Sequence, residues 1–196
     1  MDKRHLEIDV LKGVAVLFMI IFHYFYMKYL LGQSRIAIDN HMLVSMAIIS
    51  HTLFIFIFGI NMSITYKKYQ KKIEFYKKQL KRFIIYTALS VFITGFTKVI
   101  FPDRFIRFGI FHFLAASIPL SLPFLNTNYS ILGMALISIS TFLINNPVMN
   151  SLCNTSPLFC FIMGLNTLNY KSIDHFSIIP YFFIVLFGIF VGNKYY

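Results

Sequence analysis

The sequence predicts an all-α protein: a polytopic membrane helical bundle of about six transmembrane helices, with the N- and C-termini on the cytoplasmic side. Its composition, its apolar stretches and the placement of its basic residues support this prediction. Of the 196 residues, 58% are hydrophobic and only 13% are charged, and the mean hydropathy is +0.70. These values lie outside the range of soluble domains, so we expect lipid to surround most of the chain.

The apolar stretches are long enough to cross a hydrocarbon core of about 30 Å. They cover residues 10–31, 42–66, 83–101, 105–125, 129–148 and 176–191. Residues 156–165 are apolar but too short to span, so we expect 149–175 to be a re-entrant or interfacial segment. Because the sequence has no internal repeat and no linker, it predicts a single domain over residues 1–196.

The basic residues predict the orientation of these spans. Lysine and arginine number 18 against 7 acidic residues, a formal net charge of +11. One side of the membrane receives twelve of the basic residues: Lys3, Arg4, Lys12, Lys67, Lys68, Lys71, Lys72, Lys77, Lys78, Lys81, Arg82 and Lys194. The other side receives six: Lys28, Arg35, Lys98, Arg104, Arg107 and Lys171. The positive-inside rule assigns the richer side to the cytoplasm.

The two cysteines, Cys153 and Cys160, are too few for a disulfide framework and lack the spacing of a metal site. We expect them to be small apolar residues of the bundle. The alternative is that they pair, if their segment faces an oxidising compartment.

The first predicted span carries polar residues along one side. At 100° per residue, Asp9, Lys12, Val16, Met19 and His23 project within a sector of about 80°. His23 is expected roughly 16 Å beyond Lys12, near the bilayer midplane, where desolvation favours the neutral imidazole that a general base needs. The alternative is an Asp9–Lys12 surface pair, with His23 hydrogen-bonded to another helix.

Three further histidines lie in or near spans. His51 falls inside the second span and His112 inside the fourth, whereas His41 is expected at a solvated helix end. Each alone is more often a packing residue than a catalyst. With His23, His51 and His112 make three intramembrane histidines, which together favour a water-filled cavity lined by at least one of them.

The basic run at 66–82 has paired lysines with aromatic residues between them and ends in Arg82. Its simplest interpretation is a topogenic loop lying on anionic headgroups. Alternatively, it receives the phosphates of a cytoplasmic acyl donor.

The opening of the chain resembles membrane-embedded acyltransferases. The resemblance rests on Arg4-His-Leu-Glu-Ile-Asp9-Val-Leu-Lys12-Gly13-Val-Ala15, followed by His23. Two families share such an opening: the acyltransferases that modify surface polysaccharides, and the heparan-alpha-glucosaminide N-acetyltransferase-like family. Where the first family usually has Arg, this chain has Lys12, which keeps the charge but loses bidentate phosphate recognition.

Later motifs favour the second family. Residues 108–112, Phe-Gly-Ile-Phe-His, resemble its Phe-Gly-Ile-Leu-His sequence. Residues 174–176, 179–181 and 186–192 resemble its closing helix. The length also fits the second family better, because the first family usually has about ten spans and this chain has room for about six.

The resemblance implies an acyltransferase that moves acetyl from acetyl-CoA to an amino or hydroxyl group of a sugar. His23, Asp9 and His112 are then the expected catalytic residues, Lys12 and Arg82 bind the donor, and no metal is expected. The expected partners are membrane lipid and a glycan or small sugar, without nucleic acid; a homo-oligomer is left open. The expected location is the plasma membrane.

Two other classes compete with the enzyme. One is a non-catalytic bundle, transporter-like or structural, whose histidines only join helices. The other is a proton-linked carrier, which ranks last because it would be expected to have acidic residues inside its spans.

Overall fold

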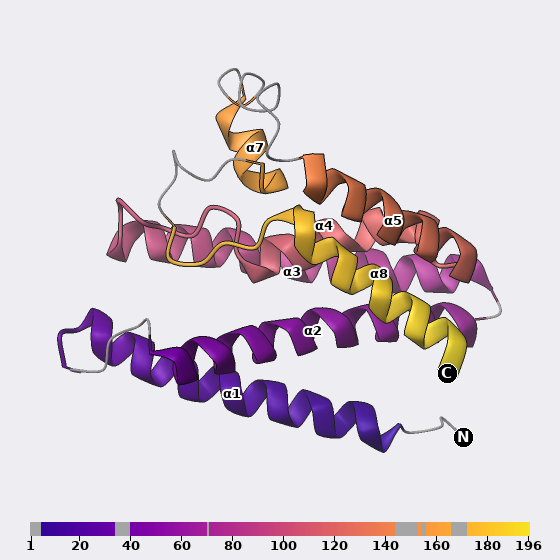
Figure 1. The fold of residues 1–196 in the computed structure, drawn as a ribbon, viewed down its shortest axis with the longest axis horizontal. Coiled ribbons are helices and arrows are strands. Elements are labelled where there is room, and N and C mark those ends of the chain that lie inside the picture. The colour runs from indigo at the N-terminus through magenta and orange to yellow at the C-terminus, as the bar shows by residue number, and fades with distance from the viewer. Residues whose placement is uncertain (1–4, 34–39, 70, 144–152, 154–155, 166–171) are drawn as a thin grey trace. The chain divides into compact units, whose positions relative to one another are not determined.

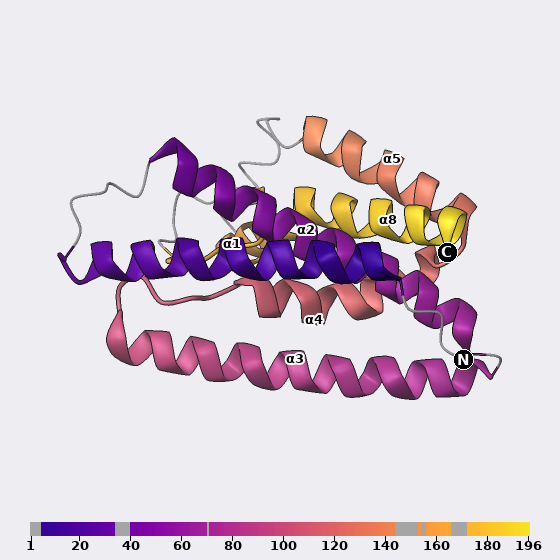
Figure 2. The same ribbon diagram turned by 90° about the horizontal axis from the view of Figure 1, so that it is seen from below.

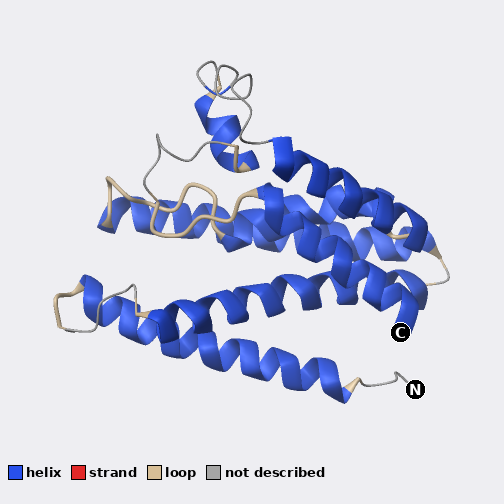
Figure 3. Ribbon diagram, viewed as in Figure 1, coloured by secondary structure: helices blue, strands red, loops and turns tan. Residues whose placement is uncertain are grey.

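In the computed structural model, the described residues are 5–33, 40–69, 71–143, 153, 156–165 and 172–196. They form α1 (Leu6–Leu30), α2 (His41–Lys68), α3 (Lys72–Ile100), α4 (Ile110–Ser121), the 3-10 helix η1 (Leu122–Phe124), α5 (Thr127–Leu143), α7 (Pro157–Met163) and α8 (Ile178–Tyr195). Every regular element of these residues is a helix (Figure 3). The predicted all-α class is therefore confirmed for the described chain.

Four of the helices are long and apolar enough to cross a membrane: α1, α2, α3 and α8. The chain is thus an integral membrane protein of helical type. The predicted fourth and fifth spans correspond to shorter helices. Helix α4 with η1 covers Ile110–Phe124, and the described part of α5 has 17 residues.

Two predicted boundaries differ from the structure. Helix α3 begins at Lys72 instead of residue 83, because Lys, Glu and Gln are good helix formers even where they are too polar for the hydrocarbon core. The fourth span was expected to begin at residue 105, but its helix begins at Ile110. Within 149–175, the described residues include the short helix α7; residues 149–152, 154–155 and 166–171 lie outside the described chain.

The contacts divide the chain into two compact units, residues 1–58 and 59–196, and α2 contributes to both. In the first unit, α1 packs on the beginning of α2. The Ser50 hydroxyl donates a hydrogen bond to the Ala15 carbonyl at 2.7 Å, and both residues are fully buried. Small residues at such a crossing let two helix backbones approach closely. The single domain over 1–196 stays a prediction.

In the second unit, the end of α2 crosses α8 at small residues. A Cβ atom added to Gly59 would collide with the Val185 carbonyl and would lie 3.0 Å from the Gly188 Cα. One turn further, the Ser63 hydroxyl donates to Asn193 Oδ1 at 2.6 Å. This is the small-residue packing typical of membrane helices, where backbone contact and interhelical hydrogen bonds replace the hydrophobic effect.

The remaining helices of the second unit pack in pairs. Helix α5 lies along α8, and α4 lies along α3 and also contacts α8 (Figures 1 and 2). Ring contacts join Phe124 to Phe182 and Phe113 to Tyr181, each with centroids 6.3 Å apart. This arrangement holds the start of α4 close to the segment that leads into α8.

Candidate active site

The polar stripe of α1 begins with an ion pair. Lys12 Nζ lies 3.2 Å from Asp9 Oδ1, and both side chains are partly exposed. The two residues are separated by three positions, so they face the same side of the helix. They form the surface pair that was the alternative to a donor-binding role. A pair of this kind is compatible with both interpretations.

His23 lies on the same side of α1, 11 residues beyond Lys12, which is about 16 Å along the helix. It is exposed, and its Nδ1 lies 2.8 Å from the Met19 carbonyl oxygen. Because a carbonyl only accepts, Nδ1 must carry the hydrogen, and the neutral ring then has its lone pair on Nε2. His23 therefore bonds its own helix one turn back and keeps an acceptor nitrogen.

The contact between α1 and α2 leaves this stripe uncovered by α2. Ala15, which contacts α2 through Ser50, marks the packed direction of α1. Counting 100° per residue, the stripe from Asp9 to His23 lies about 40° to 120° around the helix from Ala15. The stripe thus flanks the α1–α2 contact instead of filling it.

His51, on α2 of the same unit, is half-buried. It is hydrogen-bonded to the backbone of Ala47, one turn back on its own helix. His41 is exposed at the first residue of α2, as expected for a helix end.

His112 has a different environment, at the beginning of α4. The Gly109 backbone N–H donates to His112 Nδ1 at 3.3 Å, and His112 Nε2 lies 3.2 Å from the Thr94 hydroxyl oxygen. That hydroxyl donates its hydrogen to the Ile106 carbonyl at 2.8 Å, so it accepts from Nε2–H. Both ring nitrogens of His112 are therefore committed to holding the start of α4 against α3.

Asp174 caps the same helix from a distant segment. Its Oδ2 accepts a hydrogen bond from the Ile110 N–H at 3.2 Å, and a carboxylate is favoured at a helix N-terminus. A Cβ atom at Gly109 would lie 2.6 Å from this oxygen, so only glycine allows the carboxylate to approach so closely. No role was expected for Asp174 from the sequence; its place in the 174–176 segment, which carries the family resemblance, was the available signal.

Backbone hydrogen bonds join the two segments around this cap. The Phe176 N–H donates to the Phe108 carbonyl at 2.9 Å, and the Ile173 N–H donates to the Arg104 carbonyl at 2.9 Å. These bonds explain why residues 105–109 are not helical. The structure thus brings together the 108–112 and 174–176 segments, which carried the sequence resemblance.

A disulfide lies behind this cluster. Cys153 and Cys160 are bonded to each other, so the expectation of unpaired apolar cysteines is wrong and the alternative holds. The next residue, Phe161, stacks on the His175 ring at 3.9 Å, and its carbonyl lies 2.8 Å from His175 Nε2. Burial lowers the pKa of His175, while the bond to Phe161 opposes this effect.

Arg82, the second expected donor-binding residue, is half-buried on α3. Thr94, the partner of His112, lies 12 residues further along the same helix, which is about 18 Å. Arg82 and His112 therefore do not form one local site. Within the first unit, the structure brings the expected site residues Asp9 and Lys12 into direct contact.

Several lysines of the basic run have contacts within the protein. Lys72 Nζ lies 3.5 Å from the Tyr66 ring centroid and Lys78 Nζ lies 5.5 Å from that of Tyr69. Lys67 donates to the Gly192 and Asn193 carbonyls at the end of α8, at 3.2 and 2.7 Å. Lys67 therefore links the end of α2 to the end of α8, and most of the predicted loop lies in the helices α2 and α3.

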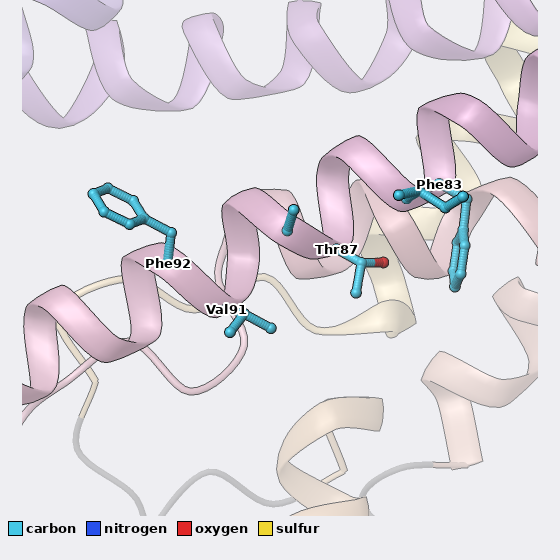
Figure 4. A pocket seen from close by; sticks show the side chains of 6 residues that line it. Phe83, Thr87, Val91 and Phe92 are labelled. Carbon is cyan, nitrogen blue, oxygen red and sulfur yellow. The ribbon is translucent and has the colours of Figure 1, made fainter.

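The hollow drawn in Figure 4 lies on α3 and has a volume of about 530 Å³. Its lining is almost entirely apolar: Phe83, Ile84, Thr87, Ala88, Val91 and Phe92. None of the expected site residues lines it. Among the described residues, no group of three or more His, Cys, Asp or Glu side chains could hold a metal ion.

The fold and these polar clusters define a polytopic helical membrane protein with histidines and an ion pair in its apolar helices. Residues 4–196 match the family model described as "Heparan-alpha-glucosaminide N-acetyltransferase, catalytic". The chain therefore belongs to this family, as the sequence motifs predicted, and the family indicates a membrane acyltransferase. No curated protein and no solved structure matches the chain significantly.

Proposed function

We propose that the protein transfers acetyl from acetyl-CoA to an amino or hydroxyl group of a sugar at the membrane. Membership of the acetyltransferase family supports the reaction class. The hydrogen bond from His23 Nδ1 to the Met19 carbonyl is the observation that supports the site, since it leaves Nε2 as a base.

In this mechanism, Nε2 of His23 accepts the proton of the sugar hydroxyl or amine. The sugar oxygen or nitrogen attacks the acetyl carbonyl, the new bond to carbon forms, and the carbon–sulfur bond of the thioester breaks. CoA leaves as a thiolate and takes up a proton. In a covalent variant, Nε2 itself attacks the acetyl carbonyl, the carbon–sulfur bond breaks and CoA leaves as a thiolate. The sugar oxygen or nitrogen then attacks the acetyl carbon, the bond to Nε2 breaks, and the sugar proton passes to solvent.

The remaining expected residues have supporting roles in this proposal. Lys12, oriented by Asp9, and Arg82 bind the phosphates of the donor on the cytoplasmic side. His112 acts as a positioning residue, because its hydrogen bonds hold the start of α4. The acceptor then binds at the opposite side of the membrane.

The topology in this proposal has six spans, the two shorter ones formed by α4 with η1 and by α5. Both termini lie in the cytoplasm, and the membrane is the plasma membrane. The disulfide supports this orientation. Disulfides persist on an oxidising side of a membrane, and the segment with Cys153 and Cys160 contains none of the twelve basic residues that are predicted to be cytoplasmic.

Radiolabelled acetyl-CoA incubated with membranes that contain the protein tests the reaction. We expect label to move to a glycan, or to stay on the chain if acetyl-His forms. Membranes with the His23→Ala variant provide the matched background. A wild-type protein that neither binds acetyl-CoA nor transfers label would favour the non-catalytic bundle.

A further inference from the structure

The N-terminal half of α3 contains a buried amide for which the described structure provides no hydrogen-bond partner. Gln79 is 2% exposed, and neither its Nε2 nor its Oε1 has a partner among the described residues. Leaving a buried polar group unpaired is costly, and the large majority of buried side-chain polar atoms in proteins have a hydrogen-bond partner. Such a residue is expected where a ligand supplies the missing bonds.

The neighbours of Gln79 along α3 define the chemistry of this position. Phe75, Gln79, Arg82 and Tyr86 project within a sector of about 60°. Phe75 is fully buried and packs on the Tyr66 ring at 5.2 Å. The stripe therefore places a carboxamide between an aromatic ring and a cation.

Arg82, one turn beyond Gln79, supplies the charge. It is half-buried, and neither of the ion pairs found among the described residues includes it. Guanidinium groups bind phosphate through paired hydrogen bonds. A carboxamide both donates and accepts, so it matches another amide or the edge of a nucleobase.

We propose that Gln79, together with Arg82, binds the amide-bearing and phosphorylated part of the acyl donor. This inference rests on the proposed function and adds a donor-binding residue to it. Gln79 hydrogen-bonds an amide of the pantetheine arm or the edge of the nucleobase, while Arg82 contacts a phosphate of the same ligand.

Calorimetric titration of the full-length protein in detergent with CoA tests this role. Gln79→Met keeps the length of the side chain and removes both polar atoms. We expect the variant to bind CoA about tenfold more weakly, because it loses the hydrogen bonds between the Gln79 amide and the ligand. Without CoA, we expect it to unfold at the same or a higher temperature, because the unpaired amide is gone.

Ser117 provides the matched control, since its hydroxyl is the other buried polar group without a partner in the described chain. Ser117→Ala should bind CoA as tightly as the wild type. Equal CoA affinity of the wild type and Gln79→Met would overturn the role of Gln79 and leave the proposed function standing. A wild type that binds no CoA would overturn both. Should Gln79→Met fail to fold, Gln79→Leu and Gln79→Glu measured in the same way replace it.

Discussion

On α1, His23 donates from Nδ1 to a carbonyl of its own helix and keeps an acceptor at Nε2. On α4, His112 accepts at Nδ1 from Gly109 and has Thr94 at Nε2. The two histidines share a residue type and an apolar helical surrounding, but only one retains a nitrogen for chemistry. The comparison teaches that the hydrogen-bond partners of its ring nitrogens, and not the hydropathy of the surrounding sequence, indicate the role of a histidine in an apolar helix.

The largest effect that tests this comparison is expected at His23. We expect His23→Ala to lower acetyl transfer by about 10²- to 10⁴-fold, the usual range for the loss of a general base. The thermal midpoint should stay the same, because the ring is exposed. Transfer is measured with labelled acetyl-CoA, and His51→Ala is the control, since His51 also bonds its own helix. Undiminished transfer by His23→Ala would remove the residue from the mechanism.

His112→Ala should act mainly on folding. The substitution removes the partners of the Gly109 N–H and the Thr94 hydroxyl and opens a cavity, so we expect a loss of about 2–4 kcal/mol in the free energy of unfolding. Thr94→Val should cost about 1 kcal/mol. Chemical unfolding in detergent measures both. A His112→Ala protein of normal stability with greatly reduced transfer would instead give His112 a direct catalytic role.

Asp174 should contribute less, as a helix cap. Asp174→Ala is expected to cost about 1–2 kcal/mol of unfolding free energy, the range for the loss of an N-terminal cap. Asp174→Asn retains an oxygen acceptor and should cost a smaller part of this. Asp103→Ala is the control, because Asp103 is an exposed acidic residue of the preceding loop. Equal stability of the Asp103 and Asp174 variants would rule out the cap.

The smallest effect is a pH dependence caused by His175. Burial lowers the pKa of this ring in the folded protein, so the unfolded chain binds the proton more readily. Stability should be constant above the ordinary histidine pKa of about 6.5 and should fall by less than about 1 kcal/mol as the pH drops below it, since solvent screens a half-buried group. Unfolding midpoints measured above and below this pKa test the pH dependence, and His175→Gln should reduce it.

The sequence predicted the helical membrane class, the family and the α1 stripe, because hydropathy, helical spacing and contiguous motifs are local signals. The predicted start of α3 was too late, because the hydropathy pattern marks only the apolar part of the helix and leaves out its lysine-rich first turns. It missed the Asp174 cap, because Asp174 and Ile110 are 64 residues apart in the chain. The cysteine pairing and the unpartnered Gln79 likewise depend on tertiary neighbours that one sequence does not specify.

The tautomers of His23 and His112 test the central claim most directly. Solid-state NMR of protein with ¹⁵N-labelled histidine at about pH 8.5, where ordinary imidazoles are neutral, distinguishes the protonated ring nitrogen from the bare one. Spectra of His23→Ala and His112→Ala assign the two signals. We predict a hydrogen on Nδ1 of His23 and on Nε2 of His112. The same tautomer at both residues would contradict the account.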